Sequence, residues 1–298
     1  MSHTYILHMF TPAQHISPFD VNMAADAGYQ LLPGCTEVGL DQITALTQDA
    51  IFSRSPKGLA HTAIFIGGRD AILAADMLDQ ARAAMFKPFM VSLMADPSGA
   101  YTTAAGMVAS VVAALQAQGQ ALAGQRVVIM GGTGPVGRIA AVLAAQAGAD
   151  VALSSHGGLA SASKAAEATG QRFGVRLGAV SGADREAVRA ALAGADVLLA
   201  CAAAGVQVVT AQDLTHAKRL KVAADVNAVP PEGIAGVGVK DNAKPLAGTQ
   251  AVGIGALAIG NVKYQTQNRL LKRMAASDTP LVLSFTEAFE TAQAYLQE

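Results

Sequence analysis

The amino-acid sequence predicts an α/β fold that combines a doubly wound parallel sheet with a separate N-terminal α/β domain. Short apolar runs alternate with helical patterns almost throughout the chain, which favours layers of helices on parallel sheets. A glycine-rich turn at residues 131–137 lies between an apolar run and an alanine-rich helical stretch. The 298 residues are enough for two domains with a sizeable core.

The first third of the chain contains three apolar runs that predict strands, at residues 5–10, 61–68 and 89–96. Helical patterns between them predict helices at residues 17–27, 44–52 and 71–86. A turn signal in "DPSGAYTTAAG" then opens a helix over residues 101–118, and "QGQALAGQ" follows it as a linker.

The middle of the chain repeats strand and helix, with strands expected at residues 126–130, 150–155, 176–180, 196–205 and 221–228. The apolar stretch 251–260 follows a loop. Near the C-terminus, Ser284 and Glu287 have the spacing of a capping box. In the helix that this box starts, one apolar face is expected to comprise Phe285, Ala288, Phe289, Ala292 and Leu296.

These patterns predict three parts. Residues 1–122 form the first domain with the connecting helix, and residues 123–260 form the domain with the glycine-rich turn. Residues 261–298 form C-terminal helices that pack back on the first domain.

The composition excludes several classes of function. A net charge of −1, from 21 basic and 22 acidic residues, predicts neither nucleic acid nor a membrane as a partner. Two cysteines suit a reducing compartment, and no signal-peptide pattern is present at the N-terminus, so we expect a cytoplasmic protein. The uncharged stretch 97–125 predicts a buried helix rather than a membrane span. Six histidines without metal-ligand spacing predict no metal site.

The glycine-rich turn has the spacing G-x-G-x-x-G at Gly132, Gly134 and Gly137, which is typical of a Rossmann-type dinucleotide site. The first glycine permits a tight turn, the second lets the backbone approach a pyrophosphate, and the third lets helix and strand pack closely. The helix start also offers unpaired N–H groups to an anion. The residues predicted to bind the cofactor are Gly132, Thr133, Gly134, Pro135, Val136, Gly137, Ser154, Ser155, His156, Cys201, Ala202 and Asn227.

The end of the second strand of this domain bears on the choice between NAD and NADP. An acid there would bind the ribose hydroxyls and repel a 2′-phosphate, but Ser154, Ser155 and His156 stand in its place. The hydroxyls can donate to a phosphate, and no arginine stands beside them. Arg138 either reaches over to the phosphate or is a solvated helix residue, and we favour the second. The site is therefore expected to accept NADP without excluding NAD.

The first domain offers polar residues in loops beside strands, each with two readings. Asp20 is a candidate site residue or an acid favourable to a helix start. Asp96, Thr102 and Thr103 are candidate site residues or helix caps. Lys263, in "GNVKYQTQ", is a candidate site residue or a surface lysine.

Seven stretches together resemble the bacterial NAD(P)-dependent methylene-tetrahydromethanopterin dehydrogenases, in order and over nearly the whole chain. These are "SPFDVNMA", "LTQDAIFSR", "TAIFIGG", "ADPSGAYTTAAGMV", "GGTGPVG", "ADVNAVPPEGIAGV" and "VGIGALAIGNVKYQTQ". The resemblance is greatest to the form that accepts both NAD and NADP. A sister form, NADP-dependent and also active on methylene-tetrahydrofolate, matches less well in the first domain. Residues 154–157 depart most from the relatives.

The resemblance implies hydride transfer from a reduced pterin to NAD or NADP in one-carbon metabolism, on the way from formaldehyde to formate. It implies a substrate domain and a Rossmann domain with the active site between them, in a homo-oligomer, specifically a trimer. It also implies a substrate site formed by Asp20, Asp96, Thr102, Thr103 and Lys263, with Asp20 and Lys263 as the catalytic residues.

This chemistry fits the absence of an acid–base constellation in the sequence. The methylene carbon lies between two nitrogens that share the cation formed when hydride leaves, so no general base is required. Positioning and a carboxylate near the cation are enough, and Asp20 is the candidate carboxylate. Two kinds of alternative stay open: a shikimate-type or NADP-dependent methylene-tetrahydrofolate dehydrogenase, and a non-catalytic NADP-binding sensor.

Overall fold

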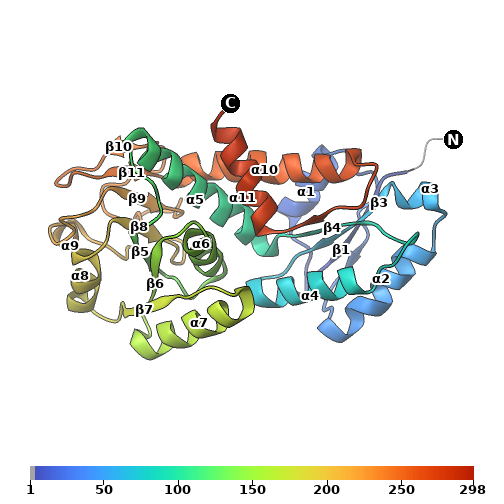
Figure 1. Ribbon diagram of the computed structural model, residues 1–298, viewed down its shortest axis with the longest axis horizontal. Coiled ribbons are helices and arrows are strands. Elements are labelled where there is room, and N and C mark those ends of the chain that lie inside the picture. The colour runs from blue at the N-terminus through green and yellow to red at the C-terminus, as the bar shows by residue number, and fades with distance from the viewer. Residues whose placement is uncertain (1–3) are drawn as a thin grey trace. The chain divides into compact units, whose positions relative to one another are not determined.

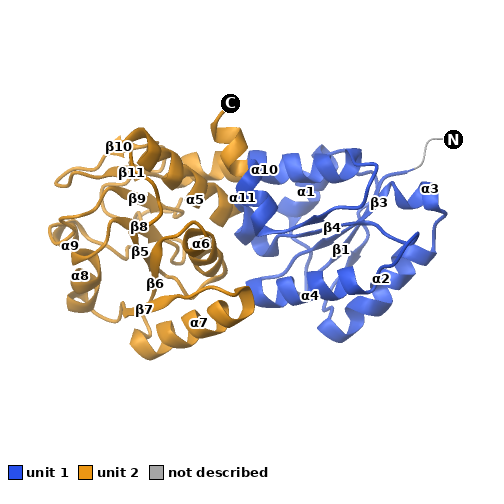
Figure 2. Cartoon of the chain, in the orientation of Figure 1, with its two compact units in different colours: residues 1–102, 264–291 blue, residues 103–263, 292–298 orange. Residues whose placement is uncertain are grey.

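The computed structural model describes residues 4–298, so the first three residues of the stretch searched for a signal peptide lie outside it. The chain divides into two compact units, coloured separately in Figure 2. Unit 1 comprises Met1–Thr102 and Tyr264–Thr291, and unit 2 comprises Thr103–Lys263 and Ala292–Glu298. The division after Thr102 comes earlier than the boundary expected after residue 122, because most of the connecting helix belongs with unit 2.

Unit 1 is built on a five-stranded sheet of order β12-β4-β3-β1-β2, in which every pair of neighbours is parallel. Every residue of β3 and β4 is buried, as expected for strands that helices cover on both faces. Figure 1 shows α1 and α10 on one side of this sheet and α2 and α4 on the other. The strands are β1 (Ile6–Phe10), β2 (Gly34–Cys35), β3 (Thr62–Ile66), β4 (Ser92–Ala95) and β12 (Val282–Leu283).

Helices α1 and α4 of unit 1 begin at side chains, Ser17 and Asp70, that accept from free N–H groups of the first turn. Asp70 accepts from the N–H groups of Ile72 and Leu73 at 2.8 and 3.0 Å and so starts α4. The helical elements are α1 (Pro18–Asp26), η1 (Leu40–Gln42), α2 (Ile43–Phe52), α3 (Pro56–Leu59), α4 (Ala71–Ala83) and η2 (Pro97–Gly99), followed by parts of α5 (Ala100–Ala117), α10 (Ala256–Ala276) and α11 (Phe285–Leu296).

Unit 2 contains a seven-stranded sheet of order β10-β11-β9-β8-β5-β6-β7, parallel except for the β10–β11 pair. The order from β7 to β11 is that of a Rossmann fold, with β5 and β8 at the point where the strand order reverses. The strands are β5 (Arg126–Met130), β6 (Asp150–Ser155), β7 (Gly178–Ser181), β8 (Val197–Ala200), β9 (Val222–Asp225), β10 (Lys244–Pro245) and β11 (Val252–Ile254). Its own helices are α6 (Pro135–Gln146), α7 (Gly158–Phe173), α8 (Arg185–Ala193) and α9 (Ala211–Leu214).

The predicted strands are present but some are shorter than expected. The strand expected at residues 196–205 ends at Ala200, because the small apolar residues after it leave the sheet. The stretch 251–260 is divided between strand β11 and the start of α10. Residues Pro97–Ala117 are long enough to span a membrane, and an 18-residue window of this stretch has a mean hydropathy of 1.3. However, 78% of that window is buried inside the protein, as in a core helix.

The C-terminal capping box is present. Glu287 accepts from the Ser284 N–H at 2.8 Å, and the Ser284 hydroxyl accepts from Thr286 N–H at 3.4 Å. Of the face predicted for α11, Phe285, Ala288 and Ala292 are buried, Phe289 is half-buried and Leu296 is exposed. The expectation for Leu296 was wrong because the helix ends there.

Candidate functional site

The turn after β5 in unit 2 has the close backbone contacts that its glycines predicted. A Cβ atom added to Gly137 would lie 2.7 Å from the Cα of Gly132, so α6 can approach the turn only because both residues lack side chains. At Gly132 itself the added atom would lie 2.9 Å from a methyl of Leu153 on β6. These two glycines are therefore required by the fold.

Gly134 differs, because a Cβ atom added there would come no closer than 3.6 Å to any neighbouring atom. It is the N-cap of α6, and Pro135 follows as the first helical residue. The space beside Gly134 is open at a helix N-terminus, where N–H groups favour an anion. This fits a dinucleotide pyrophosphate.

Sequence reasoning missed Gly131, which has a left-handed backbone conformation in the turn. Its φ is +67°, and an added Cβ would lie 2.6 Å from the backbone of Ala202. Only glycine adopts this conformation at no steric cost. The signal was the double glycine "GG" directly after the strand, of which the motif uses only the second.

A cavity of about 760 Å³, the nucleotide cavity, lies at the carboxyl ends of β5, β6, β7 and β8. This edge of a doubly wound sheet is where ligands bind. Residues from all four strand ends line it: Met130, Gly131, Thr133, Gly134, Ser154, His156, Gly182, Ala183, Asp184, Arg185, Val188, Cys201, Ala202, Ala203, Val206, Gln207 and Val208.

The cofactor residues predicted at the end of β6 divide into two groups. Ser154 and His156 line the nucleotide cavity. Ser155 does not, because its hydroxyl lies 3.0 Å from that of Ser161 and accepts from Gly157 N–H at 3.1 Å, at the start of α7. Ser155 thus has a local structural role.

Arg138 neither reaches the nucleotide cavity nor stands free in solvent. It is half-buried, and its guanidinium donates to the Thr133 carbonyl at 2.8 Å and to the Thr169 hydroxyl at 2.8 Å. Both readings from the sequence were therefore wrong, and Arg138 links the glycine-rich turn to α7.

The remaining predicted cofactor residues also separate. Cys201 and Ala202 line the cavity, whereas Pro135, Val136, Gly137 and Asn227 do not. The Asn227 side chain accepts from the N–H groups of Gly205 and Val229 and donates to the Pro231 carbonyl, which ties loops together.

The thiol of Cys201 is not a candidate nucleophile. Its burial, with the charge of Asp225, raises its pKa far above the usual value. Its contact is with the sulfur of Met107 at 3.7 Å. The thiolate required for chemistry is therefore scarce here.

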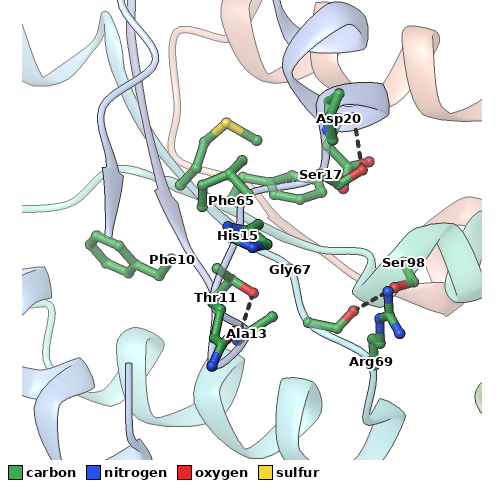
Figure 3. A pocket seen from close by; sticks show the side chains of 15 residues that line it. Phe10, Thr11, Ala13, His15, Ser17, Asp20, Phe65, Gly67, Arg69 and Ser98 are labelled. Carbon is green, nitrogen blue, oxygen red and sulfur yellow. Dashed lines mark hydrogen bonds between the residues drawn. The ribbon is translucent and has the colours of Figure 1, made fainter. Parts of the chain in front are cut away.

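In unit 1, a pocket of about 510 Å³ lies at the carboxyl ends of β1 and β3, and Asp20 lines it (Figure 3). The Asp20 side chain is almost wholly buried, and its Oδ1 accepts from Gln267 Nε2 of α10 at 2.8 Å. Helix α1 places it there, because Ser17 caps the helix by accepting from Asp20 N–H.

Asp96 and Thr102 are both fully buried and bind one another, so the helix-capping reading fits them. Asp96 accepts from the N–H groups of Tyr101 and Thr102 at 2.9 and 3.1 Å, and from the Thr102 hydroxyl at 2.6 Å. Neither residue lines the unit 1 pocket.

Thr103 and Lys263 are half-buried residues of unit 2, on α5 and α10. These helices approach closely at Gly106, where an added Cβ would lie 3.1 Å from the Lys263 nitrogen of the backbone. The backbone of Lys263 is therefore part of a tight helix contact, and the role of its side chain stays a prediction.

The sequence reasoning also missed the two basic side chains that line the unit 1 pocket, His15 and Arg69. Arg69 lies near Ser98 in Figure 3 and follows the double glycine at the end of β3. The signal was a charged residue directly after a buried strand. Among residues 4–298, no group of three or more His, Cys, Asp or Glu residues could hold a metal ion.

The comparisons with known proteins agree with the sequence resemblance. Residues 18–98 match the family model "Methylene-tetrahydromethanopterin dehydrogenase, N-terminal". The chain is 33% identical to "Bifunctional protein MdtA" of Methylorubrum extorquens strain AM1, over 91% of this chain and 92% of the relative. Shikimate 5-dehydrogenase from Listeria monocytogenes superposes with a TM-score of 0.51 over 99% of this chain and 97% of that one, at 13% identity, which shows the fold alone.

A second relative decides the family. The NAD(P)-dependent methylenetetrahydromethanopterin dehydrogenase of Methylorubrum extorquens strain AM1 is 51% identical over 288 residues, which are 96% of this chain and 97% of the relative. Such identity over nearly all of both chains confirms the resemblance seen in the sequence. The chain belongs to the family of NAD(P)-dependent methylene-tetrahydromethanopterin dehydrogenases.

Proposed function

We propose that this protein oxidises methylene-tetrahydromethanopterin to the methenyl cation, with NAD or NADP as the hydride acceptor. The observation that carries the proposal is the 51% identity over 96% of the chain to a dehydrogenase of that name. The open space at Gly134, beside a helix N-terminus, fits the dinucleotide that such an enzyme needs.

The proposed reaction does not require a general base in the protein. Hydride leaves a carbon between two nitrogens, and the nitrogens share the positive charge that remains. When bound, the nicotinamide supplies the redox chemistry of the step. The residues that would hold the dinucleotide are Gly134 at its pyrophosphate, and Ser154 and His156 at its adenosine ribose.

Asp20 is proposed to stabilise the developing cation. Its carboxylate is buried, lines a pocket and is held in position by Gln267. A fixed negative charge in a site with little water favours a transition state that gains positive charge. We propose Lys263 as the second catalytic residue and Thr103 as a further substrate contact, on the basis of the resemblance alone.

The same resemblance supports two further proposals. The protein is expected to assemble as a homo-oligomer, specifically a trimer, and to work in the cytoplasm. Light scattering of the purified protein gives the mass of the assembly, and a mass other than three chains would contradict the trimer.

The direct experiment follows the absorbance of the reduced cofactor with purified protein, NAD or NADP, and methylene-tetrahydromethanopterin. Parallel reactions with methylene-tetrahydrofolate and shikimate test the alternative enzymes. We expect turnover with the methanopterin derivative and both cofactors. Faster turnover with either other substrate would contradict the proposal, and cofactor binding without any turnover would favour the non-catalytic sensor.

A further inference from the structure

Arg185 is the only arginine or lysine among the residues that line the nucleotide cavity in the described chain. It is the first residue of α8, directly after the loop that follows β7. Its side chain is half-exposed. The motifs in the sequence gave no reason to consider it, because it lies on a different strand–helix connection from Ser154 and His156.

The loop before Arg185 lies directly on the end of β6. Strands β6 and β7 are paired, with Ser155 opposite Ser181, and Gly182 N–H donates to the Ser155 carbonyl at 3.0 Å. A Cβ atom added to Gly182 would lie 2.4 Å from the Ser154 hydroxyl oxygen. Arg185 therefore begins its helix beside the strand end that carries Ser154.

The guanidinium of Arg185 is held in place by one of its nitrogens. Nη1 donates to Asp213 Oδ2 at 2.9 Å and to the Val208 carbonyl at 3.1 Å. Within the described chain, neither Nε nor Nη2 makes a hydrogen bond. The fork is thus oriented but still has donors to offer.

The carboxylate that binds Arg185 is shared with a second arginine. Asp213 is shared with Arg189, whose Nε donates to Oδ1 at 2.8 Å. Asp184 also lines the cavity, and its Oδ1 accepts from Ala187 N–H at 2.8 Å as the N-cap of α8. The Asp213 carboxylate thus faces two guanidinium groups, and Asp184 accepts a hydrogen bond at the start of α8.

We propose that Arg185 binds the 2′-phosphate of NADP and so supplies the cation that the end of β6 lacks. The inference rests on the proposed function, because it assumes that the cavity holds NAD or NADP. A guanidinium fork forms strong charge-assisted hydrogen bonds to phosphate. NAD carries a hydroxyl at the same position, so Arg185 gives NADP an advantage that NAD does not share.

The test compares adenosine 2′,5′-bisphosphate with 5′-AMP, which differ only in the 2′-phosphate, by calorimetric titration of the full protein. Arg185→Gln is expected to weaken bisphosphate binding by about 10- to 100-fold and to change 5′-AMP binding by less than about twofold. Arg189→Gln is the matched control, because it also removes an Asp213 ion pair but does not line the cavity. It should leave the ratio of the two affinities unchanged.

Two results would overturn the assignment. If Arg185→Gln weakened the binding of both ligands equally, Arg185 would contact another part of the nucleotide. If Arg189→Gln changed the ratio of the two affinities as much as Arg185→Gln does, the effect would be indirect and act through Asp213. Failure of the proposed function gives a different outcome. If the wild-type protein binds both ligands and prefers the bisphosphate through Arg185, but does not oxidise the pterin, the proposed reaction is refuted and the role of Arg185 is still supported. A wild-type protein that binds neither ligand refutes both.

Discussion

Replacing Gly134 with valine separates the binding of a dinucleotide from the stability of the fold. Gly134 has a φ of −74° and a ψ of 167°, which valine can adopt. The added Cβ would meet nothing closer than 3.6 Å, so the free protein has room for it. Loss of the favoured N-cap residue costs up to about 1 kcal/mol, and the lower entropy of the unfolded chain offsets part of this cost.

The effect on binding should be much larger, because the side chain occupies space that the pyrophosphate needs. Loss of one charge-assisted hydrogen bond costs about 1.5–3 kcal/mol, which corresponds to about 10- to 150-fold weaker binding. NAD and NADP should suffer equally, since they share the pyrophosphate. Calorimetric titration with each cofactor, beside a melting curve, measures both effects.

Gly137→Ala is the contrasting variant for this experiment. Its Cβ would lie 2.7 Å from the backbone at Gly132, so it should lose about 1–3 kcal/mol of stability. Wild-type affinity for both cofactors in Gly134→Val would refute the placement of the pyrophosphate. A loss of stability in Gly134→Val equal to that in Gly137→Ala would refute the claim that the space is open.

Three further variants test the site and its electrostatics. Asp20→Asn keeps the oxygen that accepts from Gln267 but removes the negative charge, so kcat should fall by about 10- to 1,000-fold, equivalent to about 1.4–4 kcal/mol, at constant cofactor affinity. Unchanged turnover in steady-state kinetics would show that the role of Asp20 is structural. His156→Asp introduces a carboxylate at an exposed position that lines the nucleotide cavity. Its repulsion of the 2′-phosphate, about 1–2 kcal/mol, should raise the KM for NADP but not the KM for NAD. An equal change in both KM values would show that the adenosine ribose binds elsewhere. Burial alone would raise the pKa of Asp213, but hydrogen bonds from Thr210, Arg185 and Arg189 outweigh it and hold that pKa well below the ordinary value of 3.8. The folded state therefore gains stability above pH 3.8 and loses it as pH falls through the lowered pKa. Asp213→Asn should lower the free energy of unfolding by about 1–3 kcal/mol near neutral pH, a modest loss because the arginine partners are partly exposed. The difference in stability from wild type should shrink in acid, so melting curves that differ equally at all pH values would contradict this prediction.

The central strands of the sheets, such as β3 and β4, could be predicted from the sequence because they are buried on both faces and therefore form apolar runs. The pattern fails where pairing is short and distant in the sequence. Strand β12 has two residues, and Val282 pairs with Leu93, which lies in the first third of the sequence. No local pattern marks so short a strand, although it joins the C-terminal segment to the sheet of unit 1.

The same limit explains the difference between Ser154 and Arg185 as candidates. Ser154 was found because it lies near the end of β6, and one helix, α6, connects β6 to the glycine-rich turn. Arg185 reaches the same cavity through the lateral pairing of β6 with β7, which depends on strand order and not on sequence spacing. Residues contributed by neighbouring strands at a sheet edge become visible only when that order is known.

Asp20 and Asp96 show how three-dimensional contacts separate two residues that the sequence presents alike. Each is an acid near a helix start, for which the sequence left capping and function equally open. Asp96 accepts from Tyr101 N–H, Thr102 N–H and the Thr102 hydroxyl, all at the start of its own helix. Asp20 instead lines a pocket, and its Oδ1 accepts from a neutral amide of Gln267, far along the chain. The contacts of Asp96 thus belong to the start of α5, whereas Asp20 forms part of a pocket wall, which is why we propose Asp20 and not Asp96 as the carboxylate near the cation.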